Sequence, residues 1–387
     1  MDNPTLRIVS DPHEMKAMRE SWNELLKNSS SDTPFLTWEW MYTWWECFGD
    51  GKTPCIVVAE DQGALVGIAP LYITRGRFFG LRSLRHLEFI GSAGVITEYQ
   101  DFIIRRGRER EIVSYFLEFL FDNVRKWDVI NLTSVRKESV NLEEVRVYCD
   151  AAHVPFWEYQ SNVSPYIELN GSLDDFMKTL SQTSRYKFRN HLKKLEKGRT
   201  VKMCETMDKK SVENDFATII ELHQKRWEQK GGPGSFARYR EGYLRFHNTI
   251  IQRFFDNGWL YLLRLLVDGT PAAGHYSFFY NGVVYNHSIG FDPRWSNFRV
   301  GSVLQLLALE DCTQKGAKEF DFLRGTEEYK YIWTKKEHLS VDTVIWRSRA
   351  KARWATLERK TRKTLKSLFP KAMVEKIYHR LMNREYE

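Results

Sequence analysis

Cysteine is scarce in this 387-residue sequence, and its spacing argues against two kinds of site. The five cysteines lie far apart, at positions 47, 55, 149, 204 and 312, with no C-x-x-C pair and no histidine-rich neighbourhood. A disulfide framework or a zinc site would need closer groups of ligands. We therefore expect reduced thiols, a cytoplasmic location and no bound metal.

Long apolar runs are also missing. No stretch reaches the roughly 18 uninterrupted apolar residues that suggest a membrane-spanning helix, and WLYLLRLLV is interrupted by Arg264. The first residues, MDNPTLRIVSDPHEM, contain no basic region followed by an apolar run, so we expect no signal peptide. These absences favour a soluble, intracellular protein.

The charge balance does not select a partner. A formal net charge of +8 is compatible with an anionic ligand, with RNA or with an acidic membrane face. The content of 42% hydrophobic and 28% charged residues is typical of a globular protein, and the length suits two domains.

The order of predicted elements occurs twice. Helices, antiparallel strands, a helix and a strand recur at an offset of roughly 200 residues, as VVAEDQGALVGIAPLYI and RLLVDGTPAAGHYSFFY illustrate. The pairs Asp268-Gly269 and Asn281-Gly282 predict hairpin turns in the second copy. We predict two related domains, residues 1–163 and 164–348, followed by a basic amphipathic helical tail over 349–387.

The stretch from Arg299 to Glu337 contains the candidate site. Arg299-Val300-Gly301-Ser302 opens a predicted helix with helically spaced apolar residues at Leu304, Leu307, Ala308 and Cys312. The free N–H groups at a helix start favour phosphate, and a glycine there lets a ligand approach the backbone. The segment predicts a pocket for a phosphorylated carrier, although the same pattern also occurs without any ligand.

Several blocks resemble one family of acetyltransferases. They are SPYIELNGSLDDFMKTLSQTSRYKFRNHLKKLEKG, ELHQKRWEQKG, DGTPAAGHYSF, the junction at Gly301 and DFLRGTEEYKYIW. In this order they resemble the cellulose-biosynthesis-associated (CelD-like) family of the GNAT superfamily, which is akin to the Fem-type aminoacyl transferases. The resemblance is strongest from Ser164 to Trp333. It implies an α/β (α+β) fold of tandem GNAT units, each a mixed, mostly antiparallel sheet flanked by helices, the first unit without a donor site.

The resemblance also implies a location for the donor. In that superfamily two neighbouring parallel strands diverge, and the pantetheine arm of acyl-CoA lies between them. Carried over, these strands are Val283–Phe291 and Glu319–Leu323, and the pyrophosphate lies over Arg299, Val300, Gly301 and Ser302. The superfamily loop commonly reads [RQ]xxGxG/A, whereas this one has a single glycine and a shifted spacing. Aminoacyl-tRNA, the donor of the Fem-type enzymes, therefore remains an alternative.

Acyl transfer from a thioester needs an aligned electrophile, donors for the oxyanion and a proton for the leaving thiolate. A backbone N–H near Ser288–Gly290 is the candidate oxyanion donor, and Tyr329 or Tyr331 is the candidate proton donor. The other candidates are Lys330, Asp321 and His275 for catalysis, Arg324 and Lys330 for carrier phosphates, and Trp227, Glu228 and Trp333 for the acceptor. Each of these residues also has an ordinary explanation as a core or surface residue.

Three functions follow from these observations. The first is transfer of an acyl group from acyl-CoA to an amine or hydroxyl acceptor, such as a saccharide, in envelope polysaccharide metabolism. The second uses aminoacyl-tRNA, because the basic segment Arg185–Arg199 could follow phosphates. The third is a catalytically inactive scaffold that contacts a synthase or the inner membrane face through the basic tail.

Overall fold

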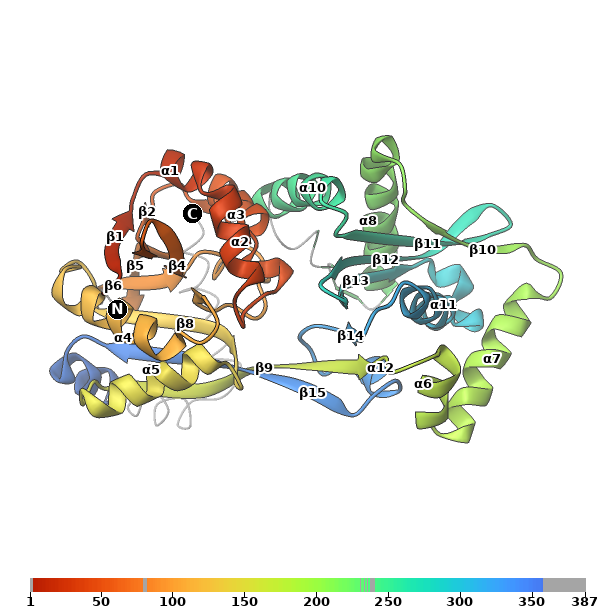
Figure 1. The fold of residues 1–387 in the computed structure, drawn as a ribbon. Helices are drawn as coiled ribbons and strands as arrows, with labels where there is room; N and C mark the ends of the chain where they lie inside the picture. Colours follow the sequence, from red (N-terminus) through yellow and green to blue (C-terminus); the bar gives the residue numbers. More distant parts are fainter. Residues whose placement is uncertain are drawn as a thin grey trace.

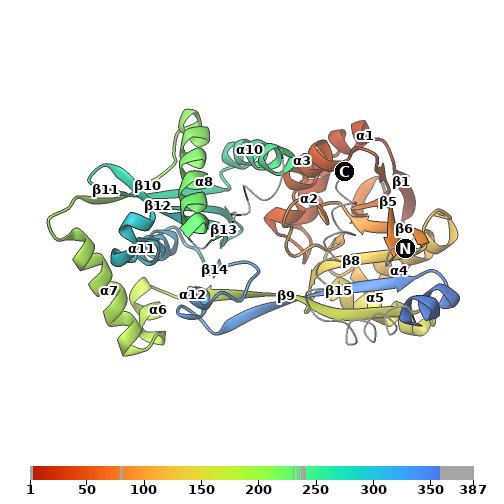
Figure 2. The ribbon, with the colours of Figure 1, turned by 180° about the vertical axis from the view of Figure 1, so that it is seen from behind.

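Two lobes lie side by side, joined by two long strands, β9 (Phe156–Glu168) and β15 (Lys336–Trp346) (Figure 1). The computed structural model describes residues 3–357, apart from 79–81, 230, 233, 235 and 237–240. We call residues 3–155 the N-terminal lobe and residues 169–335 the C-terminal lobe. The view from behind shows the same two strands crossing between the lobes (Figure 2).

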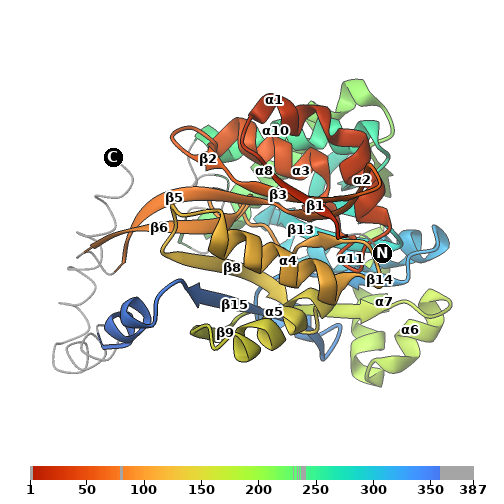
Figure 3. The same cartoon turned by 60° about the vertical axis from the view of Figure 1, so that its left-hand side comes forward.

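The N-terminal lobe surrounds a helix of tryptophans. Its elements are β1 (Thr5–Val9), α1 (Pro12–Ala17), α2 (Arg19–Lys27), η1 (Pro34–Leu36), α3 (Trp38–Phe48), β2 (Thr53–Pro54), β3 (Ile56–Asp61), β4 (Ala64–Ala69), β5 (Leu71–Phe78), β6 (Arg82–Phe89), β7 (Ile103–Ile104), α4 (Glu109–Asp122), β8 (Val129–Arg136) and α5 (Val140–Ala151). Trp40 and Trp44 of α3 are fully buried. Figure 3 shows α1 and α3 on one side of β5 and β6, and α5 on the other.

The C-terminal lobe contains the predicted hairpins. Its elements are α6 (Leu173–Thr179), α7 (Gln182–Glu196), β10 (Val201–Glu205), η2 (Lys209–Ser211), α8 (Val212–Gln229), α10 (Glu241–Asp256), β11 (Leu260–Val267), β12 (Thr270–Tyr280), β13 (Val283–Phe291), η3 (Pro293–Phe298), α11 (Val300–Gln314), β14 (Glu319–Asp321) and α12 (Glu328–Tyr331). Asp268-Gly269 and Asn281-Gly282 have positive φ at both residues, which suits a type I′ turn between twisted strands.

One sheet of eleven strands runs through both lobes, in the order β10-β11-β12-β13-β14-β9-β15-β8-β6-β5-β2. A second sheet, β1-β3-β4-β7, belongs to the N-terminal lobe. The fold is therefore the predicted mixed, mostly antiparallel α/β architecture. The predicted boundary at residues 163 and 164 lies inside β9, which pairs with β15 from Phe156 to Tyr166.

Each lobe has one parallel strand pair at the equivalent place in its topology. In the N-terminal lobe β6 pairs with β8, and in the C-terminal lobe β13 pairs with β14, each over three residue pairs. Beyond the first pair, Gln100 fills the space: its amide donates to the Ile90 carbonyl at 2.9 Å and its backbone N–H donates to the Ser134 carbonyl at 3.1 Å. This insertion bridges the two diverging chains in the N-terminal lobe.

Helices cover both faces of the C-terminal part of the large sheet. Helix α8 packs so closely on β13 that a Cβ on Gly290 would lie 2.3 Å from the His223 nitrogen. Helix α11 covers the opposite face. Its predicted apolar residues Leu304, Ala308 and Cys312 are buried, but Val303, Leu306 and Leu309 are buried as well. The buried surface of α11 is therefore wider than these predicted residues, because α11 also packs against α6 and α7.

The start of the predicted tail packs against the N-terminal lobe. Residues 349–357 are helical, and Ala352 and Ala355 lie in one apolar cluster with Trp346. Leu357, the last residue that the structure describes, is 64% exposed. The rest of the predicted tail lies outside the described residues. Among the helices that the structure describes, none combines the length and the apolar character needed to cross a bilayer.

Candidate functional site

Strands β13 and β14 separate after a short parallel pairing, and we call the opening between them the seam. Pairing runs only from Val283 with Glu319 to Tyr285 with Asp321, although β13 continues to Phe291. The chain after Asp321 stays with β9 instead, since Phe322 donates to the Pro165 carbonyl and Gly325 to the Val163 carbonyl. The seam therefore opens toward the C-terminal end of β13.

Two cations satisfy backbone carbonyls that the divergence leaves without a strand partner. The Lys330 ammonium donates to the carbonyls of Leu323 at 3.0 Å and Arg324 at 2.6 Å, and its residue is only 3% exposed. On the other side the Arg226 guanidinium donates to the Ile289 carbonyl at 2.9 Å. Buried carbonyls need partners, so these contacts stabilise the open arrangement.

A cavity of about 170 Å³ lies in the seam. It is lined by Arg226, Ile289, Phe291, Ser296, Arg299, Val300, Gly301, Ser302, Gln305, Tyr329 and Trp333. The Arg226 guanidinium lies 5.3 Å from the centre of the Tyr329 ring and 5.5 Å from that of Phe291. Burial raises the pKa of Tyr329 to about 12, against the opposing effect of Arg226, so the phenol is neutral at pH 7.

The start of α11 forms one wall of this cavity. Arg299 ends η3 in the left-handed region, with φ of 55°, and the helix begins at Val300 with no side-chain cap. The N–H groups of Val300 and Gly301 donate to no backbone carbonyl among the described residues and lie at the positive end of the helix dipole, whereas Ser302 already donates to the Arg299 carbonyl at 2.8 Å. The predicted helix start is confirmed.

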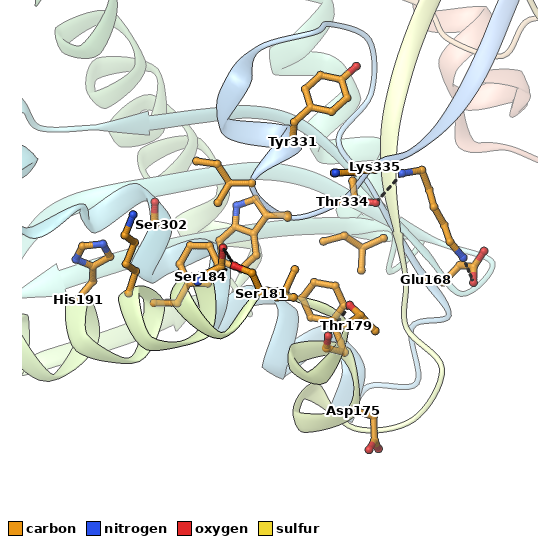
Figure 4. A pocket seen from close by; sticks show the side chains of 18 of the residues that line it. Glu168, Asp175, Thr179, Ser181, Ser184, His191, Ser302, Tyr331, Thr334 and Lys335 are labelled. Carbon is orange, nitrogen blue, oxygen red and sulfur yellow. Dashed lines mark hydrogen bonds and ion pairs between the residues drawn. The ribbon is translucent and has the colours of Figure 1, made fainter.

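A larger pocket of about 970 Å³ adjoins the cavity, and both are lined by Arg299, Ser302 and Trp333. Figure 4 shows Ser181, Ser184 and His191 along its α7 wall, Tyr331 on the opposite wall and Glu168 at the far end from His191.

Positive charge dominates one end of the larger pocket. Burial lowers the pKa of His191, and the charges of Arg299, Lys194 and Lys187 lower it further. Lys187 and Arg299, which lie near His191 in the pocket lining, form no ion pair with another described residue. This wall suits an anionic ligand such as phosphate.

Asp321 and His275, predicted as bases, line neither opening. Both side chains are fully buried. Asp321 accepts hydrogen bonds from the Tyr99 hydroxyl at 2.5 Å and the Leu323 N–H at 2.7 Å. His275 lies beside Asn286, and burial followed by the charge of Arg226 lowers its pKa to about 3. Because both side chains are enclosed, neither lies where it could reach a ligand in these two openings.

Arg324 and Lys330, predicted to neutralise carrier phosphates, are also committed elsewhere. Arg324 pairs with the buried Glu98 and donates to the Thr97 carbonyl, which ties the two lobes together. Lys330 caps the carbonyls described above. Neither cation lines the larger pocket.

The three predicted acceptor residues have different positions. Trp333 lines both openings and stacks on Phe188 with ring centres 3.9 Å apart. Trp227 donates to His223 at 3.0 Å, and Glu228 is exposed on α8 and accepts from Gln224. The structure brings Trp333 together with Tyr329 and the Arg299–Ser302 segment, but does not bring Trp227 or Glu228 there.

Arg226 and Gln305 are among the cavity residues that the sequence did not point to. Arg226 is an ordinary cation within a helical pattern, and nothing local indicates that it reaches β13. Gln305 carries a usable signal, because it is the one polar residue within the apolar run VLQLLAL of α11. A glutamine that interrupts an apolar helix face needs a buried partner.

Three side chains of the neighbouring strands β14 and β15 lie close enough to bind a metal. Single ligand atoms of Glu319, Asp321 and His338 lie within 4.8 Å of one another. His338 contacts Glu319 at 3.0 Å, however, and the Arg136 guanidinium lies 4.0 Å from Asp321. A neighbouring cation and existing hydrogen bonds favour a structural role for this cluster.

A comparison with models of protein families gives a match for part of the chain. Residues 182–331 match the model of the acetyltransferase (GNAT) domain. A comparison with curated protein sequences gives no match.

Three solved structures share the fold of most of the chain. FemX superposes with a TM-score of 0.58 at 12% identity, over 88% of this chain and 96% of its own. A conserved protein of unknown function from Bacteroides thetaiotaomicron gives 0.53 at 10% identity, covering 88% and 100%. A C-terminal DUF2156 domain from Agrobacterium fabrum gives 0.53 at 11%, covering 90% and 96%.

The family match and the geometry coincide, since residues 182–331 contain both sides of the seam, Arg226, Tyr329 and the start of α11. The C-terminal lobe is therefore an acyltransferase domain of the GNAT superfamily, built into a two-lobed fold like that of FemX.

Proposed function

We propose that the protein transfers an acyl group from acyl-CoA to an amine or hydroxyl acceptor. The observation that carries this proposal is the open seam, which ends at an uncapped helix start and adjoins a cationic pocket. A linear carrier with a narrow thioester arm and a phosphorylated head would fit the seam, the helix start and the cationic pocket in that order. The family resemblance supports a saccharide or another acceptor of envelope polysaccharide metabolism.

The bound donor would contact three regions of the chain. The arm would lie in the seam between Ile289 and Tyr329, the pyrophosphate over Gly301 and Ser302, and the nucleotide in the larger pocket near Lys187. The N–H groups of α11 and Lys187 would stabilise the phosphates.

The transfer step requires little beyond positioning. A neutral amine attacks the thioester carbonyl carbon, the carbonyl oxygen becomes negative, and collapse forms the amide bond and breaks the carbon–sulfur bond. Backbone N–H groups at Ser288–Gly290 are the proposed oxyanion donors. The phenol of Tyr329 donates a hydrogen bond to the leaving sulfur, and the proton lost by the amine completes the thiol of free CoA.

Donor use is tested by measuring release of free thiol from acetyl-CoA, and from longer acyl-CoA, with panels of amino sugars, amines and polyols. Mass spectrometry of the products then identifies the acylated acceptor. We expect thiol release that depends on one acceptor class. If no acyl-CoA is bound at millimolar concentration, the proposal is wrong.

A second donor, aminoacyl-tRNA, is favoured by one observation. Helix α7 lies at the end of the C-terminal lobe that is remote from the N-terminal lobe (Figures 1 and 2), and its outer side carries Arg185, Tyr186, Arg189 and Lys193. Tyr186 is 70% exposed. Exposed cations beside an aromatic ring suit a nucleic-acid backbone and an unpaired base.

The tRNA alternative is tested by gel shift with charged tRNA at several salt concentrations. Binding through phosphates predicts a shift that weakens steeply as salt rises and that is reduced in Arg185→Gln and Lys193→Gln. The absence of any shift at low salt would exclude this donor.

A further inference from the structure

Gln305 is an unsatisfied polar side chain inside the seam cavity. It lies on α11, one turn after Gly301, and its residue is only 2% exposed. Neither its side-chain oxygen nor its side-chain nitrogen finds a hydrogen-bond partner among the described residues. It nevertheless lines the cavity, opposite β13. Leaving both atoms of a buried amide unpaired is unfavourable, so the position calls for a ligand.

The chemistry of a glutamine side chain restricts that ligand. The nitrogen donates and the oxygen accepts, so a complementary group must offer both an acceptor and a donor. A backbone-like secondary amide does so with its carbonyl and its N–H. A plain hydrocarbon chain offers neither, and a phosphate offers only acceptors at neutral pH.

The position of the cavity indicates which kind of ligand would bring a secondary amide to Gln305. Gln305 lies deeper than Gly301 and Ser302, where the proposed function puts the phosphates. Arg226 lines the same cavity with Ile289 and Tyr329, and its Nε atom is also without a partner among the described residues. Polar groups within an otherwise apolar seam suit an arm of alternating methylene and amide groups.

We propose that Gln305 recognises an amide of the phosphopantetheine arm, donating from its nitrogen to the amide carbonyl and accepting the amide N–H on its oxygen. This inference rests on the proposed function and adds a specificity-determining residue to it. It requires an amide-containing arm, which both coenzyme A and a carrier protein can supply.

The test uses calorimetric titration of the full-length protein with three probes. CoA contains the arm and the nucleotide, 4′-phosphopantetheine contains only the arm, and adenosine 3′,5′-bisphosphate contains only the nucleotide. In Gln305→Leu, which keeps the volume but removes both hydrogen bonds, we expect about tenfold weaker binding of CoA and phosphopantetheine. Binding of the bisphosphate should be unchanged.

Two further variants separate recognition from structural effects. Gln314→Leu changes an exposed glutamine at the far end of the same helix and should leave all three affinities unchanged. Gln305→Glu keeps an acceptor but loses the donor, and should weaken CoA binding as Gln305→Leu does. An equal loss for all three probes would mean a distorted helix start and would overturn the inference.

The remaining outcomes also decide the matter. If Gln305→Leu binds CoA as tightly as the wild type, the two atoms are satisfied by water alone, and the inference fails while the proposed function stands. If the wild type binds neither CoA nor phosphopantetheine, both fail together. If the wild type binds phosphopantetheine but not the bisphosphate, and Gln305→Leu weakens the binding of phosphopantetheine, the inference holds and a carrier protein is the source of the arm.

Discussion

Tyr329 and Lys330 are neighbours in the sequence, but their side chains have different surroundings. Tyr329 lines the cavity, while Lys330 points into the backbone of the chain that leaves β14. The motif DFLRGTEEYKYIW predicted that both residues belong to the site, because it contains both of them. It could not assign their roles, since the direction of each side chain depends on a four-residue helix, α12, and on the carbonyls beside it.

Replacement of the Tyr329 hydroxyl tests its contact with the leaving sulfur. In Tyr329→Phe we expect kcat to fall about 100-fold with little change in KM for the donor, because the ring remains while the hydrogen-bond donor is lost. Steady-state thiol release measures this, and a thermal melt confirms that folding is unchanged. An undiminished kcat would remove Tyr329 from the mechanism.

His275 makes the stability of the protein depend on pH. Burial, followed by the charge of Arg226, lowers its folded-state pKa to about 3, below the value of about 6.5 in the unfolded chain. Its contribution is present above pH 6.5 and is lost as the pH falls. Between pH 7.5 and 5 the wild type should lose about 2 kcal/mol more than His275→Gln. Urea unfolding at both pH values measures this, and equal losses in the two proteins would contradict it.

At the scale of elements, the seam stays open or is filled according to which side chains hydrogen-bond the backbone carbonyls along its edges. The two lobes have the same parallel strand pair, but Gln100 bridges the diverging chains in the N-terminal lobe, whereas Lys330 and Arg226 cap the edges in the C-terminal lobe. The contacts of Lys330 and Arg226 leave a cavity between the strands, whereas Gln100 fills the corresponding space in the N-terminal lobe. This difference gives a physical reason for the expectation that only the C-terminal lobe holds a donor.

Removal of the Lys330 cap should destabilise the C-terminal lobe. In Lys330→Met the carbonyls of Leu323 and Arg324 lose a buried cationic donor, so we expect the free energy of unfolding to fall by about 2 to 3 kcal/mol. Urea unfolding measures the change. Lys335→Met, which alters an exposed lysine five residues later, is the matched control and should have no measurable effect. Equal stability of the two variants would mean that the carbonyls do not need Lys330.

Local patterns predicted the elements with strong local signals. The two glycine turns, the meander from β11 to β13 and the start of α11 follow from turn chemistry and periodicity. The long strands β9 and β15 do not, because Phe156 and Ile345 pair across nearly 190 residues, and α5 was missed as well. The cavity depends on the same long-range pairing, so Arg226 and Gln305 could not be placed from sequence.

At the scale of the whole molecule, the lobes share a sheet and buried contacts. Tyr99 of the N-terminal lobe donates to Asp321, and Arg324 pairs with Glu98. The aromatic core also crosses between lobes, as the contact of Phe35 with Phe278 shows. The two-domain prediction therefore describes the repeat of the topology better than it describes independent units.

This continuity predicts one cooperative unfolding transition. Tryptophans are concentrated in α3 of the N-terminal lobe, whereas far-ultraviolet circular dichroism reports on helices of both lobes. Melting curves from tryptophan fluorescence and circular dichroism should therefore coincide. Two separated transitions would show that the lobes unfold independently.

The central claim is that the seam between β13 and β14 holds the arm of an acyl carrier. A crystal structure of the protein with bound CoA tests it most directly. The account predicts the arm between Ile289 and Tyr329, an amide beside Gln305 and the pyrophosphate at the start of α11. CoA bound elsewhere, with Arg226 and Tyr329 still closed on each other in the seam, would contradict it.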